Sequence, residues 1–229
     1  MKKISIFLII FEILTVSAIW ASNLMPPADV YVLGAVHGFI QRRSHKNRQW
    51  LKIGEGKQIR GNSEIQSGLH TRAIFLLHMK TMMELGSSTK LVVHFQKVKN
   101  LYKFWDNLKS GSLWINFKKF QHSPEIYKIT STGMVFTILS KFANFQLKHE
   151  KNKNELIMNN GVVQVATRGG EKILSGKYLY AFENGYLVLK RRWGHEEKVQ
   201  LENWEKFQKK TVKNFKWILR RWRSSLKHH

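Results

Sequence analysis

The chain has 229 residues, of which 43% are hydrophobic, so one domain with a packed core is expected and wholesale disorder is not. Its 39 Lys and Arg face only 15 Asp and Glu, and the net charge of +24 would attract polyanions, although a generally basic proteome would produce the same charge without such a partner. Cysteine is absent, which excludes disulfides, thiol catalysis and cysteine zinc sites.

Residues 1–21 have the layout of a secretory signal peptide. Two lysines precede an apolar run that extends to Val16, and small residues follow up to Ala21. The alternative is an uncleaved N-terminal anchor, because residues 4–20 reach the short limit for a transmembrane helix. Both interpretations predict an exported protein in the periplasm or cell envelope, with membrane association as an option, and nucleic acid is therefore not an expected partner.

Residues 22–33 are predicted to form a linker, because a proline pair near its start disfavours helix. The body of the chain, 34–192, consists of short apolar segments that end at Gly, Asn or Ser, where the backbone can turn. Residues 30–40 predict the first strand or pair of strands, and residues 41–49 predict a basic polar loop.

The clearest strands in the middle of the chain are Thr71–Leu77 and Thr89–Phe95. In the second, an apolar face alternates with a mixed one, as in a half-buried sheet: Leu91, Val93 and Phe95 lie on the first, and Lys90, Val92, His94 and Gln96 on the other. Residues 97–109 space their apolar side chains by three and four, which predicts a short amphipathic helix or a turn-rich crossover. Strand alternation resumes at 113–117.

Two hairpins are predicted towards the end of the body. Gly161–Thr167 should pair with Lys172–Leu174, and Tyr178–Phe182 should pair with Tyr186–Leu189 around an Asn-Gly turn. Long alternation of helices and strands, which a doubly wound fold requires, does not occur. We therefore predict a mainly β fold of stacked short strands, either a β-solenoid or a jelly-roll-like sandwich, with one C-terminal amphipathic helix.

That helix is predicted over residues 198–227, where proline and glycine are absent. One side is apolar and is predicted to dock: Trp204, Phe207, Phe215, Ile218, Leu219 and Trp222. The opposite side is basic and is predicted to bind an anionic surface: Lys206, Lys209, Lys210, Lys213, Lys216, Arg220 and Arg223. The helix either covers the β body or attaches to a membrane or partner, and both are compatible if only the basic side is used outside.

Several glycine-punctuated segments follow one another in a characteristic order. They are Ile53–Gly56 and Gly61–Leu77, then Met83–Leu91, then Leu108–Trp114, and finally Asn160–Val165. This order resembles the FecR domain, the periplasmic module of ferric-dicitrate signal transducers, over roughly residues 34–182. The sequence departs from the family pattern at His78–Thr81 and Phe142–Phe145, where the family often has glycine turns.

The resemblance implies an envelope-side sensing or scaffolding module without a catalytic apparatus. The ferric-dicitrate transducer acts on a sigma factor through a cytosolic segment that precedes its apolar run. Only two lysines stand at that place here, so anti-sigma activity is not expected.

The sequence contains no pattern typical of an enzyme, a metal site or a cofactor site. Its ten histidines lack zinc-ligand spacing, and no nucleophile motif, carboxylate pair or phosphate-binding glycine loop is present. We therefore predict a non-catalytic exported binding or signalling module of FecR type, with an unidentified envelope protein or glycan as partner. The alternative is a basic structural protein that associates with a membrane or polyanion through its C-terminal helix.

Overall fold

The computed structural model describes residues 30–44, 49–60, 62–77, 81–99, 101–119 and 125–225, and for residues 30–32, 60 and 212–225 it describes the backbone alone. The predicted signal peptide or anchor at 1–21 and most of the predicted linker lie outside the described residues. Within the described part of the chain, no helix has both the length and the apolar character needed to cross a membrane.

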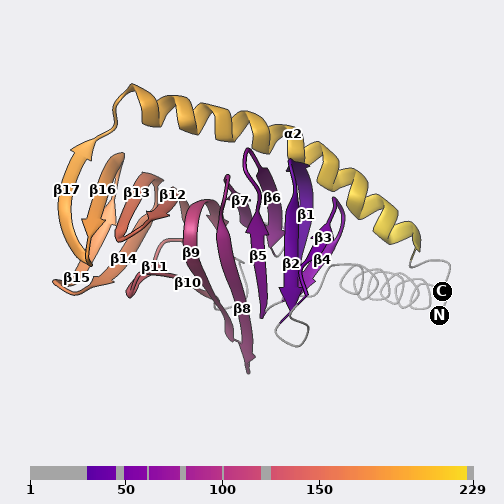
Figure 1. Ribbon diagram of the computed structural model, residues 1–229, viewed down its shortest axis with the longest axis horizontal. Helices are drawn as coiled ribbons and strands as arrows, with labels where there is room; N and C mark the ends of the chain where they lie inside the picture. Colours follow the sequence, from indigo (N-terminus) through magenta and orange to yellow (C-terminus); the bar gives the residue numbers. More distant parts are fainter. Residues whose placement is uncertain are drawn as a thin grey trace, which may run out of the picture.

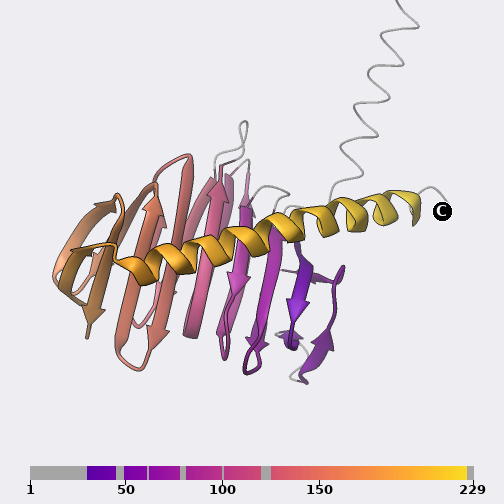
Figure 2. The ribbon, with the colours of Figure 1, turned by 90° about the horizontal axis from the view of Figure 1, so that it is seen from above.

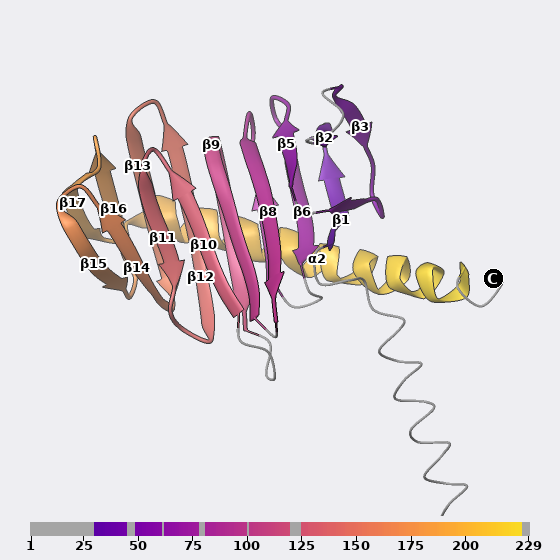
Figure 3. The same cartoon turned by 90° about the horizontal axis from the view of Figure 1, so that it is seen from below.

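The described strands form two sheets that pack face to face (Figures 1 and 3). Neighbouring strands of sheet A, in order, are β4 (Gln58–Arg60), β1 (Val30–His37), β6 (Arg72–Leu77), β7 (Thr81–Leu85), the second part of β9 (Leu101–Lys118), β12 (Phe142–Glu150), β13 (Lys153–Asn160), β16 (Tyr178–Glu183) and β17 (Tyr186–Arg192). Those of sheet B are β3 (Leu51–Ile53), β2 (Ile40–Ser44), β5 (Ser63–Ser67), β8 (Lys90–Val98), the first part of β9, β10 (Glu125–Ser131), β11 (Met134–Ile138), β14 (Val162–Thr167) and β15 (Gly170–Ser175).

The long strand β9 belongs to both sheets. Its first part pairs in parallel with β10, and its second part pairs in antiparallel fashion with β7 and β12. The two sheets are therefore one hydrogen-bonded network, yet they do not close into a barrel. The prediction of a mainly β fold with a single C-terminal helix is confirmed, and of the two architectures that it left open, the layers correspond to a sandwich.

Glycines mark the places where the chain passes from one sheet to the other. At Gly111, inside β9, φ is +89°, and a Cβ atom would lie 2.3 Å from the hydroxyl of Thr89. That hydroxyl accepts a hydrogen bond of 2.9 Å from the Ser112 amide. Gly38 and Thr71 repeat the arrangement between β1 and β2, where φ is +87° and the Phe39 amide donates to the Thr71 hydroxyl. The glycine segments that resemble FecR are thus largely crossovers between sheets.

The main core lies between the sheets, where alternate residues of the strands point inward. Fully buried aromatic residues come from both layers, including Phe75 and Phe145 of sheet A and Phe136 of sheet B. Sheet A also carries a second apolar surface on its outer face, formed by Ile74, Leu76, Trp114, Ile157 and Leu179. An exposed surface of this kind would be unfavourable in water, and it requires a cover.

The cover is α2 (His195–Ser225), which runs across the outer face of sheet A and continues past β1 (Figures 1 and 2). Its start is capped by Glu197, which accepts a 2.7 Å hydrogen bond from the Gly194 amide and pairs with Arg191 of β17 at 2.6 Å. The Arg191 guanidinium lowers the pKa of Glu197, with further help from the Gly194 amide. The helix begins three residues before the predicted start at 198, because this cap precedes the amphipathic stretch.

Several predictions about local structure are corrected. Residues 97–109 are not a helix or crossover, since 101–109 lie in β9, where Phe104, Asp106 and Leu108 alternate inward. Gln41–Ser44 belongs to β2 and pairs with β5, although it was predicted as loop, because its charged side chains point out of the sandwich or to its rim. β1 begins at Val30, as the strand prediction for residues 30–40 has it, so the end of the segment assigned to the linker 22–33 lies in this strand. The two late hairpins and the strands at 71–77 and 89–95 are confirmed.

Candidate ligand-binding face

The two sheets have very different outer faces, and each bears on one predicted site. α2 packs on the outer face of sheet A through a small set of large side chains. The outer face of sheet B has no described element packed on it, as Figure 3 shows, where its strands lie in front and α2 behind. The predicted site residues lie on α2.

The side chain of Trp204 is fully buried between α2 and sheet A. It stacks on Trp114 of β9 with ring centroids 5.7 Å apart and an angle of 20° between planes. Phe207 is 8% exposed and lies against His37, with ring centroids 5.3 Å apart. Both residues were predicted as docking residues, and both contact sheet A.

Phe207 also meets a charged group of the sheet. The guanidinium carbon of Arg72 lies 4.4 Å from the Phe207 ring centroid, a cation–π arrangement. Arg72 simultaneously makes a bidentate pair with Glu84, at 2.6 and 3.1 Å. Burial raises the pKa of Glu84, even though Arg72 acts in the opposite direction. The helix therefore packs on a surface that is apolar at its centre and has beside it an ion pair in which Glu84 is buried and Arg72 is partly exposed.

The basic side of α2 faces away from the sheet where its side chains are described. Lys206, Lys209 and Lys210 are exposed. The remaining predicted residues lie outside the described side chains: Lys213, Lys216, Arg220 and Arg223 of the basic set, and Phe215, Ile218, Leu219 and Trp222 of the docking set. The backbone carries these positions into the part of α2 that continues past β1 (Figure 2).

The outer face of sheet B is basic. Because side chains alternate along a strand, the strand pairings place six Lys and Arg of sheet B on this face: Arg43, Lys52, Lys90, Lys103, Lys109 and Lys128. Two acidic residues, Glu64 and Glu171, share it. The imbalance makes this face attractive to an anionic ligand.

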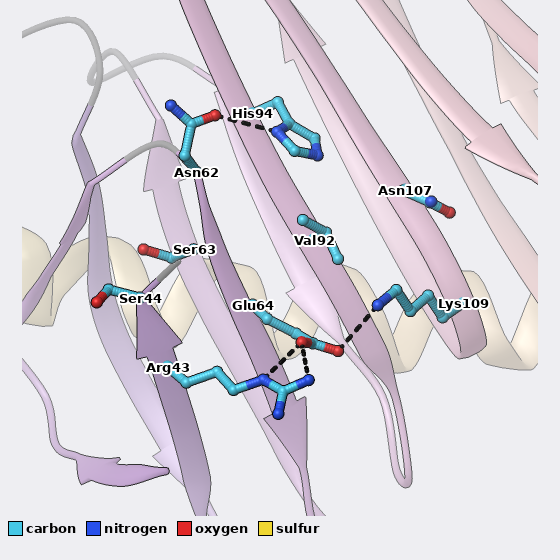
Figure 4. Close-up of a pocket in the computed structure, with 9 residues that line it drawn as sticks. All are labelled: Arg43, Ser44, Asn62, Ser63, Glu64, Val92, His94, Asn107 and Lys109. Atoms are coloured by element: carbon cyan, nitrogen blue, oxygen red, sulfur yellow. Dashed lines mark hydrogen bonds and ion pairs between the residues drawn. The ribbon is translucent and has the colours of Figure 1, made fainter. Parts of the chain in front are cut away.

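This face contains a hollow of about 730 Å³ (Figure 4). Strands β2, β5, β8 and β9, with the residue that precedes β5, line it through Arg43, Ser44, Asn62, Ser63, Glu64, Val92, His94, Asn107 and Lys109. Val92 pairs with Glu64 on one side and with Asn107 on the other, so it lies in the middle of the hollow. Four adjacent strands thus bring charged, amide and aromatic groups together.

One end of the hollow is an ion-pair triad. Glu64 accepts from Arg43 at 2.7 Å (Nε) and 2.6 Å (Nη2), both to the same oxygen, and from Lys109 at 3.1 Å to the other. Burial alone would raise the pKa of Glu64, but the hydrogen bonds from Arg43 and Lys109 lower it overall. The Arg43 guanidinium carbon lies 4.7 Å from the Trp50 ring centroid. The triad holds one surplus positive charge in a defined position.

The other end of the hollow is aromatic. His94 stacks on Trp105 of β9 with ring centroids 5.6 Å apart and only 13° between planes. Nδ1 of His94 lies 3.0 Å from Oδ1 of Asn62, which orients the imidazole ring. In Figure 4, His94 and Asn62 lie at the opposite end from Arg43 and Lys109.

The hollow was not predicted as a site from the sequence. The usable signal was the mixed face of β8, where Val92 and His94 alternate with buried Leu91 and Val93. Within the described residues, no group of three or more His, Asp or Glu lies close enough together to hold a metal ion. The chemistry assembled here suits binding by ion pairing, hydrogen bonding and stacking.

Comparisons with known proteins add little to this geometry. No family model matches the chain, and no curated protein matches it. Two crystal structures of a candidate anti-sigma factor from Parabacteroides distasonis ATCC 8503, at 1.65 and 2.50 Å resolution, align with TM-scores of 0.46 and 0.47 at 15% and 14% identity. Each alignment covers 56% of this chain, and the chain spans 59% of that protein's length.

Proposed function

We propose that the protein is an exported, non-catalytic binding and signalling module of the cell envelope, of FecR type, and that its ligand occupies the outer face of sheet B. The observation that carries the proposal is the contrast between the two outer faces. α2 occupies the apolar face, whereas the basic face retains a hollow in which groups from four strands converge.

The state of the charged groups in the hollow supports binding over catalysis. Glu64 has a lowered pKa and is held by two cations, so it is ionised at neutral pH and poorly suited to transfer protons there. Arg43 and Lys109 are fixed by the same carboxylate. Such an arrangement presents a constant charge to a ligand.

Charge reversal on the two faces tests where the ligand binds. We would measure co-sedimentation of the purified full chain with isolated envelope fragments. Lys103→Glu with Lys128→Glu on sheet B should abolish sedimentation, whereas Lys206→Glu with Lys209→Glu on α2 should leave it nearly unchanged. The reverse result would overturn the proposal. Protease protection of the full chain in intact cells, with digestion after the envelope is opened, tests export, and recovery in the cytosolic fraction would contradict it.

A second function is favoured by the exposed lysines of α2 and by the continuation of the helix past β1. In this alternative, the basic side of α2 attaches the protein to an anionic membrane. Each basic residue near such a surface contributes about 1 kcal/mol, and salt screens the attraction.

Vesicles of neutral lipid with and without anionic lipid test this second function. It predicts sedimentation with anionic vesicles at low salt and release on the order of 0.5 M salt, where the Debye length is a few Å. Replacing Lys206, Lys209 and Lys210 with Gln should weaken this attachment. Equal indifference of the unmodified chain to vesicle charge and to salt would exclude it.

A further inference from the structure

We propose that the hollow on sheet B binds an acidic saccharide, with one sugar ring at the His94–Trp105 end and the carboxylate of another sugar unit of the same oligosaccharide at the Arg43–Lys109 end. This inference rests on the proposed function in one respect, since it takes the outer face of sheet B as the ligand face. It adds the chemical class of the ligand and the residues that would recognise it.

The charged end retains donors after its internal pairing. Arginine has five N–H donors and lysine has three. Glu64 engages the Nε and Nη2 groups of Arg43 and one donor of Lys109. The side chains of Arg43 and Lys109 are 37% and 46% exposed, whereas that of Glu64 is 14% exposed. The carboxylate thus lies beneath the two cations and holds them towards the ligand side.

The position of Arg43 is further restricted by Trp50, over which its guanidinium lies. A cation held on two sides loses little side-chain freedom when an anion binds, which favours affinity. Guanidinium and ammonium groups that converge on one point form charge-assisted hydrogen bonds with a carboxylate. The fixed surplus charge therefore indicates one anionic group at this end.

The aromatic end offers a flat surface with polar edges. His94 and Trp105 are stacked, and Asn62 orients the imidazole ring. His94 is two residues from Val92 on β8, so it lies about 7 Å along the strand from the middle of the hollow. An aromatic surface suits the apolar face of a sugar ring, and the neighbouring amides of Asn62 and Asn107 can bond its hydroxyl groups.

The combination distinguishes an acidic sugar from a simple polyanion. A polyanion such as DNA or polyphosphate would be attracted by all six basic residues of the face, mostly without contact geometry. Binding of polyphosphate would not require the stacked His94–Trp105 pair beside the triad of Arg43, Glu64 and Lys109. DNA would require the stacked pair only if its bases stacked there. The ligand class is therefore defined by simultaneous dependence on Lys109 and His94, which lie at opposite ends of the hollow.

Isothermal titration of the full chain with oligogalacturonate, a carboxylated saccharide, tests the inference. A neutral maltooligosaccharide of equal length, short duplex DNA and polyphosphate are the comparison probes. We expect oligogalacturonate to bind most tightly and the neutral sugar to bind at least tenfold more weakly. Equal or tighter binding of DNA or polyphosphate would overturn the proposal.

Matched variants locate the binding. Lys109→Gln should weaken oligogalacturonate binding about tenfold, because a charge-assisted hydrogen bond is lost. Lys90→Gln removes the same charge from the same face outside the hollow, and it should change binding by less than about twofold. His94→Ala should weaken binding roughly fivefold through lost stacking. Equal effects of Lys109→Gln and Lys90→Gln would reduce the site to diffuse attraction and contradict the inference.

The result is separable from the proposed function. If oligogalacturonate fails to bind but Lys103→Glu with Lys128→Glu still abolishes sedimentation with envelope fragments, the saccharide inference is wrong. The assignment of the outer face of sheet B as the ligand-binding face is then still supported. If envelope sedimentation depends on the lysines of α2, the ligand face itself is wrong.

Discussion

The outer faces of the two sheets are built from strands of similar length, yet one is buried and the other is not. On sheet A, Trp114 of β9 is 5% exposed because Trp204 covers it. On sheet B, Trp105 of the same strand is stacked only on His94 among the described ring contacts, at the edge of an open hollow. β9 thus contributes Trp114 to a packing interface and Trp105 to a stack on His94, a residue that lines the candidate site.

The difference follows from the residues that alternate with the core. In β6 and β13 of sheet A these are Ile74, Leu76 and Ile157, so the strands are apolar on both faces, as in sheets covered on both sides. In β5 and β8 of sheet B the corresponding residues include Glu64 and His94, polar side chains that can remain in contact with water. α2 is therefore part of the folded structure, and the basic face is available to a ligand.

Of the changes that test this difference between the two faces, removal of α2 should have the largest effect on folding and solubility. Truncation after Arg192 would leave the apolar outer face of sheet A in water, and we expect aggregation or loss of soluble protein. Truncation after Thr211, which keeps Trp204 and Phe207, should preserve the fold. Soluble yield and far-UV circular dichroism of the two truncations check this. A folded, monomeric protein ending at Arg192 would show that α2 is dispensable for stability.

A smaller but still large effect is expected from one side chain of the interface. Trp204→Ala should lower the free energy of unfolding by about 3–5 kcal/mol through a cavity between α2 and sheet A. Trp204→Phe should cost clearly less, because the indole N–H has no hydrogen-bond partner within the described part of the chain. Lys209→Ala, on the exposed side, should stay within about 0.5 kcal/mol. Urea denaturation measures all three, and equal effects at Trp204 and Lys209 would contradict docking.

The cap that joins β17 to α2 should contribute less. Glu197→Gln removes the charge that pairs with Arg191 and accepts from the Gly194 amide, and we expect a loss of roughly 1–2 kcal/mol. Because the folded pKa of Glu197 is lowered, its contribution is present above the unfolded pKa and is lost as pH falls through the folded pKa. The difference from the unmodified chain should therefore shrink in acid. Glu196→Gln, at an exposed neighbouring position, is the control and should lower the free energy of unfolding at pH 7 by clearly less than Glu197→Gln.

The smallest expected effect is a difference in pH dependence between two carboxylates, one from each outer face. The pKa of Glu64 is lowered in the folded protein, so its stabilisation is present above the unfolded value near 4.5 and disappears as pH falls. Burial raises the pKa of Glu84, so its charged form is penalised above its folded pKa and the penalty disappears as pH falls. Relative to each Gln variant, the unmodified chain should lose stability in acid for Glu64 and gain it for Glu84. Urea midpoints at pH 7, 5.5 and 4 check the signs, and slopes of the same sign would contradict the assignment.

Much of the fold could be predicted from the sequence because local patterns reflect local physics. Alternation in Leu91, Val93 and their neighbours predicted a half-buried strand, and the Asn184-Gly185 pair predicted the last hairpin. The residues of 97–109 misled the prediction because spacings of three and four between apolar residues also occur in a strand with Trp105 outside and Phe104 inside. Short segments satisfy both periods, and only pairing with β8 and β10 selects the strand.

By itself, the sequence determined the mainly β class, the amphipathic C-terminal helix and the excess of positive charge, since these depend on composition and on neighbours within a few residues. Tertiary structure alone decided which surfaces meet. Trp204 stacks on Trp114, which lies ninety positions earlier in the sequence. The hollow brings together Arg43, Glu64, His94 and Lys109 from four strands. Such contacts are set by strand register and by which outer face is apolar enough to need the helix, and neither is encoded in a short stretch of residues.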